Sequence, residues 1–315
     1  MQSNEYFLGF SVFSGIGPQT MKKLLKEFTS AENAWQQSPE VLENILGEKT
    51  ANRFVVFRKQ FSFSEYLEKL RSKSISFLTW EDKDYPSLLL ESPHSPFVLY
   101  YKGDFSILHN TKSIGIVGTR KITAYGKQVT EMVTQELAKQ NMVIVSGLAL
   151  GVDAVAHKTA LENYGSTIAV LGSGVDICTP SSHQKLYDEI KEKGVIVSQF
   201  PPGAASVKGF FPARNALIAG LSQAVLVTEA GVTSGALITA KRATELKRQV
   251  FCIPGPITSS LSLGITFLLK NGAFPVASGR DILDRLGIIE KTEKKESLVF
   301  DSFSPEEQEI IHLLE

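Results

Sequence analysis

Short apolar runs recur from residue 114 onward, and a stretch long enough for a helix follows each of them. Strands that are apolar at nearly every position are buried on both faces, as in a parallel sheet that helices cover. The alternation therefore predicts an α/β fold with an open, doubly wound, mostly parallel sheet. The runs are IGIVG (114–118), MVIVSG (142–147), TIAVLG (167–172), VIVSQF (195–200), AVLVTEA (224–230), VFCIPG (250–255) and, more weakly, FPVAS (274–278).

The beginning of the chain has a different pattern. Between about residues 4 and 73, apolar side chains recur at helical spacing, as in Leu24, Leu25 and Phe28, which predicts a small all-α domain over residues 1–75. From residue 76 to 105 the pattern changes to short extended pieces broken by prolines. This change predicts an edge strand or covering segment that leads into an α/β domain over residues 76–288.

The end of the chain predicts a linker and one further helix. Residues 289–303 mix both charge signs with few apolar side chains, as a linker does. In SPEEQEIIHLLE (304–315), Ser304 is a candidate N-cap and Glu307 completes a capping box. A helix this short is marginal alone, so it either docks on the α/β domain or begins a further domain.

Composition restricts the choice of partners. Lys+Arg and Asp+Glu number 33 each and hydrophobic residues make up 43% of the chain, which is typical of an ordinary globular protein and excludes a highly basic tail. Nucleic-acid affinity must therefore come from a local patch.

The two cysteines, Cys178 and Cys252, and the absence of a charged-then-apolar leader favour a reduced, cytoplasmic protein. Because no apolar run approaches about 18 residues, we expect no transmembrane segment.

Glycine-containing loops follow four of the predicted strands. Ligands of a doubly wound sheet lie beyond the carboxyl ends of its strands, where loop amides and helix N-termini point outward. One glycine turn is commonly only a turn, but four at one edge predict a row of amide donors for an anionic ligand. The residues are Gly118, Thr119 and Arg120; Ser146, Gly147 and Gly151; Gly172, Ser173 and Gly174; and Ser234 and Gly235.

These loops match no nucleotide-binding or catalytic motif. GSGVD (172–176) lacks the GxGxxG spacing, and no loop has the P-loop arrangement. The five histidines are scattered without metal-ligand spacing, and we find no nucleophile–base–acid set. We therefore predict no catalytic residue, metal or cofactor. His157, one turn after Asp153, is expected to make a helix-face hydrogen bond.

A local excess of positive charge lies between residues 207 and 250, which hold six basic residues, Lys241 among them, and two glutamates. At its start, KGFFPARN (208–215) predicts an exposed loop in which Lys208 and Arg214 flank two phenylalanines. We expect one of the rings to anchor the loop and the other, Phe211, to stack on a base. Cations beside an aromatic face suit single-stranded nucleic acid, because stacking contributes about 1–3 kcal/mol per base.

Several motifs occur in a specific order: GTR, SGLALGVDAVAHKTAL, TIAVLGSGVD, FPARNALIAGLS, VTEAGVTSGALITA and VFCIPG. In this order and spacing the chain resembles the DNA-processing protein A family (DprA, also called Smf). The resemblance implies an extended Rossmann-like domain that binds single-stranded DNA, forms a homodimer and helps to load the RecA recombinase in bacterial natural transformation, without enzyme activity. It also implies a sterile-alpha-motif-like domain over residues 1–75 and a winged-helix domain that would begin near Ser304.

The resemblance also assigns site residues. It implies a phosphate loop at Gly118, Thr119 and Arg120 and a second glycine loop at Ser146, Gly147 and Gly151. A basic, aromatic DNA segment falls at Lys208, Phe211, Arg214 and Asn215, and Ser234 and Gly235 close the pocket. The chain departs from the family pattern at Ala216, His183, Gln199 and Thr266. Ala216 replaces an arginine, and losing one phosphate contact would lower the salt exponent by about 0.7.

The segment SGIGPQTMKKLLKEF (14–28) resembles a helix-hairpin-helix loop, whose turn presents amides to a DNA phosphate. Gly15 and Gly17 are thus possible DNA contacts, or they simply form a turn before a helix.

Two other functions stay open at this point. Phosphoribohydrolases that act on nucleoside monophosphates share this Rossmann-like superfamily and carry a PGGxGTxxE signature. Here the equivalent loop reads EAGVTSGAL, without consecutive glycines and without a glutamate four or five residues later. The other alternative is a nucleotide-sensing module that reports a small ligand to a partner domain.

Overall fold

The computed structural model describes residues 4–288 and Ser304. The predicted linker (289–303) and the rest of the predicted C-terminal helix (305–315) lie outside the described residues.

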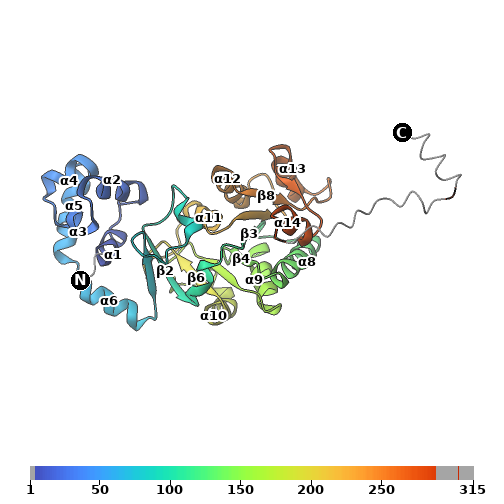
Figure 1. The fold of residues 1–315 in the computed structure, drawn as a ribbon, viewed down its shortest axis with the longest axis horizontal. Helices are drawn as coiled ribbons and strands as arrows, with labels where there is room; N and C mark the ends of the chain where they lie inside the picture. The colour runs from blue at the N-terminus through green and yellow to red at the C-terminus, as the bar shows by residue number, and fades with distance from the viewer. Residues whose placement is uncertain (1–3, 289–303, 305–315) are drawn as a thin grey trace.

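The N-terminal region is helical, as its apolar spacing predicted (Figure 1). Its core is aromatic: the Phe54 ring stacks on Phe10 at a centroid distance of 5.1 Å and meets Trp35 edge-on at 5.1 Å. The region contains α1 (Glu5–Val12), α2 (Pro18–Phe28), α3 (Ala31–Gln36), α4 (Pro39–Leu46), α5 (Glu48–Gln60) and α6 (Phe63–Ser72).

Within residues 4–288, nine strands form one sheet in the order β1-β2-β6-β5-β4-β3-β7-β8-β9. All neighbours are parallel except β1 with β2 and β2 with β6, which are antiparallel. The predicted α/β fold and its mostly parallel sheet are thus confirmed, and the structure adds that the strands of the 76–105 segment pair antiparallel. The strands are β1 (Ser76–Thr79), β2 (Val98–Gly103), β3 (Ser113–Val117), β4 (Val143–Ser146), β5 (Thr167–Val170), β6 (Val195–Ser198), β7 (Ala224–Val227), β8 (Gln249–Cys252) and β9 (Phe274–Pro275).

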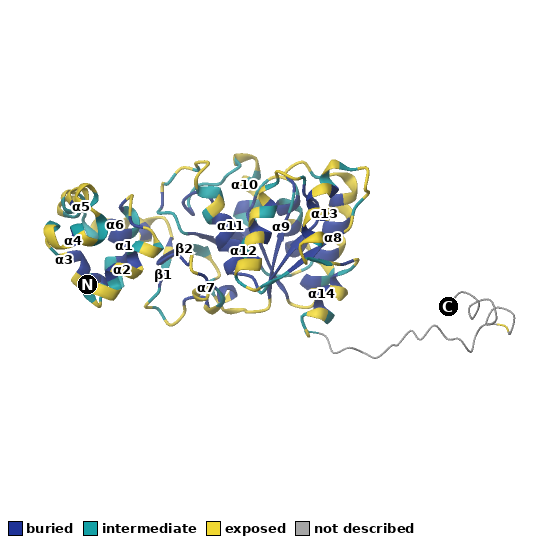
Figure 2. Cartoon of the chain, turned by 90° about the horizontal axis from the view of Figure 1, so that it is seen from above, coloured by how far each residue is buried: buried dark blue, intermediate teal, exposed yellow. Residues whose placement is uncertain are grey.

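Helices cover both faces of the sheet, so its central strands are wholly buried (Figure 2). The helices α8, α9, α10 and α14 cover one face, and α7, α11, α12 and α13 cover the other. Burial on both sides explains why these strands are apolar at most positions. The helices are α7 (Ser87–Leu90), α8 (Ala124–Lys139), α9 (Val152–Glu162), α10 (Gln184–Lys193), α11 (Phe210–Gly220), α12 (Gly235–Glu245), α13 (Leu263–Lys270) and α14 (Gly279–Arg285).

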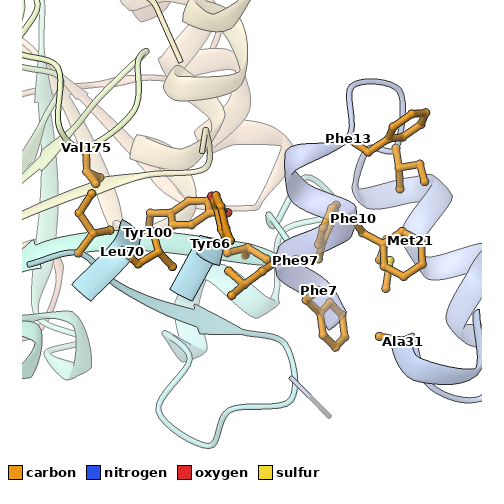
Figure 3. Packing of buried hydrophobic residues seen from close by; sticks show 14 of the residues in the cluster. Phe7, Phe10, Phe13, Met21, Ala31, Tyr66, Leu70, Phe97, Tyr100 and Val175 are labelled. Atoms are coloured by element: carbon orange, nitrogen blue, oxygen red, sulfur yellow. The ribbon is translucent and has the colours of Figure 1, made fainter. Parts of the chain in front are cut away.

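A shared core joins the N-terminal helices to the sheet. Figure 3 shows Phe7 and Phe10 of α1 on one side and Tyr66 and Tyr100 on the other, all in one apolar cluster. The Tyr100 hydroxyl is buried and lies 3.1 Å from the Tyr66 hydroxyl. Because buried hydroxyls need partners, this contact also fixes how α6 sits on β2.

None of the helices in the described part of the chain is long and apolar enough to cross a membrane.

Candidate nucleic-acid interface

A cleft of about 540 Å³ opens where β3, β4 and β7 end. The chain reverses its direction of strand addition between β3 and β7, and ligands of doubly wound sheets bind at such a switch point. Nine of the site residues predicted from the sequence line this cleft: Gly118, Thr119, Arg120, Lys208, Phe211, Arg214, Asn215, Ser234 and Gly235.

Two arginines of the cleft lie near the Phe211 ring. The Arg120 guanidinium carbon is 5.1 Å from the ring centroid and that of Arg214 is 5.9 Å from it. Both distances fall within the range of cation–π attraction. Arg120 and Lys208 are exposed at the rim, so the cleft combines surface cations with an aromatic ring.

The prediction of an exposed loop over residues 208–215 is wrong from residue 210 onward. Phe210 is the first residue of α11. The helix tolerates Pro212 at its third position, because the amide that proline lacks is one that the first turn of a helix leaves unpaired. Phe210 stacks on Phe200 at a centroid distance of 3.8 Å, so it is the anchoring ring. Arg214 is buried in the helix rather than exposed.

The predicted row of amide donors is also wrong, since the protein itself uses several of these amides. The Thr119 amide donates to the Glu229 carbonyl at 2.8 Å, and the Gly174 amide donates to Ala204 at 2.9 Å. The Gly147 amide donates to the Asp153 carboxylate at 3.1 Å. These three amides are therefore already paired within the protein.

The other predicted residues lie outside the cleft. Gly151 has a φ of 79°, and a Cβ there would lie 2.2 Å from the Thr119 carbonyl oxygen, so it lets two loops pack together. The buried residues are Ser146, Gly147, Gly172, Ser173 and Gly174. Lys241 lines a separate groove beside α13, and Gly15 and Gly17 border a crevice of about 280 Å³ with Phe200 and Phe210.

The departures from the family pattern also have positions in the structure. Ala216 is buried in α11 and does not line the cleft. His183 Nδ1 lies 3.0 Å from the Leu148 carbonyl oxygen, and the Thr266 hydroxyl donates to the Ser262 carbonyl at 2.9 Å. Gln199 lines the crevice near Gly15.

Two acidic residues that matter here were not predicted as site residues. Glu229 accepts bonds from the Thr123 hydroxyl at 2.6 Å and the Thr123 amide at 3.0 Å, and so fixes the start of α8 behind the cleft. Asp153 forms a buried ion pair with Arg214, with 3.3 Å between nitrogen and oxygen. No pattern in the sequence links these partners, although an acid at a helix start is a visible signal.

His157 makes the expected helix-face contact and allows a pH prediction. Its Nδ1 lies 2.7 Å from the Thr167 hydroxyl. Burial, and then the charge of Arg214, lower its pKa from 6.5 to about 3. Below pH 6.5 the His157 imidazole is protonated in the unfolded chain but stays neutral in the folded chain. The contribution of this histidine to the free energy of unfolding is therefore fully present above pH 6.5 and is lost as the pH falls toward 3.

We expect this histidine to steepen acid destabilisation. As the pH falls from about 7 to 5, the free energy of unfolding of the wild type should fall more steeply than that of His157→Asn, and the difference in slope should rise toward about 1.4 kcal/mol per pH unit. Urea denaturation at several pH values between about 7 and 5 measures the difference in slope, a range set by the titration of unfolded histidine. Parallel pH curves for the two proteins would contradict the assignment.

Among the described residues, no group of three or more His, Cys, Asp or Glu side chains is placed to hold a metal ion.

The fold and the cleft together define a Rossmann-like protein with a cationic, aromatic site at the switch point of its sheet. Residues 76–287 match the model of the family described as DNA recombination-mediator protein A. The chain therefore belongs to this family.

Relatives match over most of the chain. Protein Smf of Synechocystis sp. is 42% identical over 289 residues, which cover 90% of this chain and 73% of that protein. The DNA processing protein DprA of Streptococcus pneumoniae is 39% identical over 84% of this chain and 93% of its own length. Its crystal structure superposes with a TM-score of 0.80 over 90% of this chain and 98% of that chain, at 35% identity.

A second solved relative is DNA processing protein A of Helicobacter pylori, whose structure is described as showing a single-stranded DNA binding mode. It superposes with a TM-score of 0.62 at 32% identity, over 69% of this chain and 98% of that chain.

Proposed function

We propose that this protein binds single-stranded DNA in the cleft at the switch point and acts as a DNA-processing protein in bacterial natural transformation. The observation that carries the proposal is the grouping of Arg120, Lys208 and Arg214 around the Phe211 ring. The Helicobacter pylori relative, whose structure is described as showing a single-stranded DNA binding mode, supports it.

The chemistry of the cleft suits an unpaired strand. Cations contact the sugar-phosphate chain irrespective of sequence, while an exposed ring face stacks on a base that duplex pairing would hide. Binding should therefore depend on salt and on strandedness rather than on sequence.

A titration with fluorescent oligo-dT tests this function. We expect the single strand to bind more tightly than the matching duplex, with the logarithm of the affinity falling linearly with the logarithm of the salt concentration. Fluorescence anisotropy at several salt concentrations gives both quantities. Equal affinity for the duplex would contradict the proposal.

The proposal extends to partners and domain organisation. We propose a homodimer, for which an apolar groove of about 880 Å³ that includes Ile238 and Phe267 is a suitable surface.

We also propose that the protein protects incoming DNA and loads RecA, which the description of the family as recombination mediators supports. Residues 1–75 would be a sterile-alpha-motif-like domain and residues 76–288 the DNA-binding domain. Light scattering and RecA pull-down experiments test the two partners.

A nucleotide-binding function is the second candidate, because a cleft of about 540 Å³ has the size of a small-molecule site. We favour binding over catalysis. Within residues 4–288, Asp153 is the acidic residue that lines the cleft, and its carboxylate is occupied by Arg214. Release of free base from nucleoside monophosphates would support hydrolysis. Saturable binding of a mononucleotide without binding of oligonucleotides would support sensing.

A further inference from the structure

The Asp153 carboxylate organises the floor of the cleft through a single oxygen. Asp153 lies in the first turn of α9 and is 4% exposed. Its Oδ2 accepts a hydrogen bond from the Gly147 amide at 3.1 Å, from the Ala149 amide at 3.4 Å and from Arg214 Nη1 at 3.3 Å. One atom thus fixes both the loop after β4 and the guanidinium that lies on it.

Gly147 makes that arrangement possible because it has no side chain. A Cβ at this position would lie 1.3 Å from Arg214 Nη1, so the guanidinium rests directly against the backbone of the loop. The Phe211 ring, with its centroid 5.9 Å from the guanidinium carbon, borders Arg214 as well. Arg214 therefore rests on a backbone platform and lies near an aromatic ring, at the wall of the cleft.

Two physical effects predict opposite changes in DNA affinity when the Asp153 carboxylate is removed. A carboxylate beneath a DNA cleft repels phosphates, so charge alone predicts that its removal tightens binding. A buried arginine, however, is held in place by its counter-ion, and a cation in a fixed position binds a phosphate with less loss of side-chain entropy. Burial lowers the pKa of Arg214, and the charge of the nearby Asp153 opposes that shift.

We propose that Asp153 is a positioning residue for single-stranded DNA: it holds Arg214 on the Gly147 platform, so removing this negative charge weakens binding. The inference rests on the proposed function. The simpler interpretation is that Asp153 only stabilises the start of α9 and the preceding loop. That role would change stability but would not act through Arg214.

The first test is Asp153→Asn, with Glu162→Gln as the matched control. Glu162 lies on the same helix but is exposed, so the control removes an equal charge far from the cleft. With fluorescent oligo-dT we expect Asp153→Asn to weaken binding about tenfold, a typical loss for a broken charged hydrogen bond. Its salt exponent should fall by about 0.7, as for one lost phosphate contact. Glu162→Gln should leave both quantities unchanged.

A double-mutant cycle distinguishes positioning from general stabilisation. In an Arg214→Gln background, Asp153→Asn should have no further effect on affinity, because its partner is already gone. Equal losses in the two backgrounds would overturn the proposal, as would tighter or unchanged binding by Asp153→Asn alone. If the wild type itself binds no oligo-dT, the proposed function fails instead, so the two failures are distinguishable.

Gly147→Ala provides a second test that leaves the charges of Asp153 and Arg214 in place. If Asp153→Asn does not fold, this variant alone tests whether the position of Arg214 controls DNA affinity. The added methyl group occupies the position of the guanidinium and must displace it. We expect a similar loss of affinity and the same fall in the salt exponent, with folding monitored by circular dichroism. An unchanged titration would mean that the position of Arg214 does not matter for DNA.

Discussion

Replacing Phe211 by alanine is expected to weaken binding of oligo-dT by about 1–3 kcal/mol, or roughly 5- to 150-fold, which is the contribution of one stacked base. The ring is half-buried at the cleft, with Arg120 at 5.1 Å, so its loss removes both a stacking surface and the contact that holds that arginine. Fluorescence anisotropy with wild type and variant measures the change.

Two controls accompany this experiment. Phe211→Trp keeps an aromatic face and should retain most of the affinity. Tyr164→Ala removes a fully exposed ring that does not line the cleft, and it should have no effect on DNA binding. Wild-type affinity in Phe211→Ala would show that bases do not stack on this ring.

Replacing Phe54 by alanine is expected to lower the free energy of unfolding by about 3–5 kcal/mol, the usual cost of a large cavity in an aromatic core. Phe54 is fully buried, stacks on Phe10 and meets Trp35 edge-on. Urea denaturation followed by tryptophan fluorescence measures the loss, because Trp35 lies in the same cluster.

Val56→Ala is the matched control for this prediction. Val56 lies on the same helix, α5, but is 59% exposed, and surface substitutions usually change stability by less than about 0.5 kcal/mol. Equal denaturation midpoints for Phe54→Ala and Val56→Ala would mean that the aromatic cluster contributes little to folding.

The regular elements of the fold follow from local pattern. The run IGIVG overlaps β3 and the run TIAVLG overlaps β5, because a strand covered on both faces is apolar at most positions. The helical spacing around Leu24 likewise predicted α2, where Leu24 is buried and its polar neighbours Lys22 and Lys23 are exposed. In both regions the signal depends only on neighbouring residues.

Predictions from glycine and proline positions were wrong where tertiary packing decides the conformation. Gly209 and Pro212 indicate a turn, yet α11 begins between them, because Phe210 packs on Phe200 from a different segment of the chain. GSGVD resembles an open ligand loop, yet its Gly172 packs against the Phe211 ring. Glycine permits close approach, but the sequence does not say whether a ligand or the protein itself approaches.

The amino-acid sequence by itself determined the layered α/β architecture, the helical N-terminal region and the residue types that gather around the cleft. Periodicity and composition act over a few neighbouring positions, so they are visible without any coordinates. The tertiary structure alone decided that Arg214 is buried against Asp153, 61 residues away, and that several loop amides are already used. Such pairings depend on which segments meet in space, and the need to satisfy buried polar groups then settles which donors stay free for a ligand.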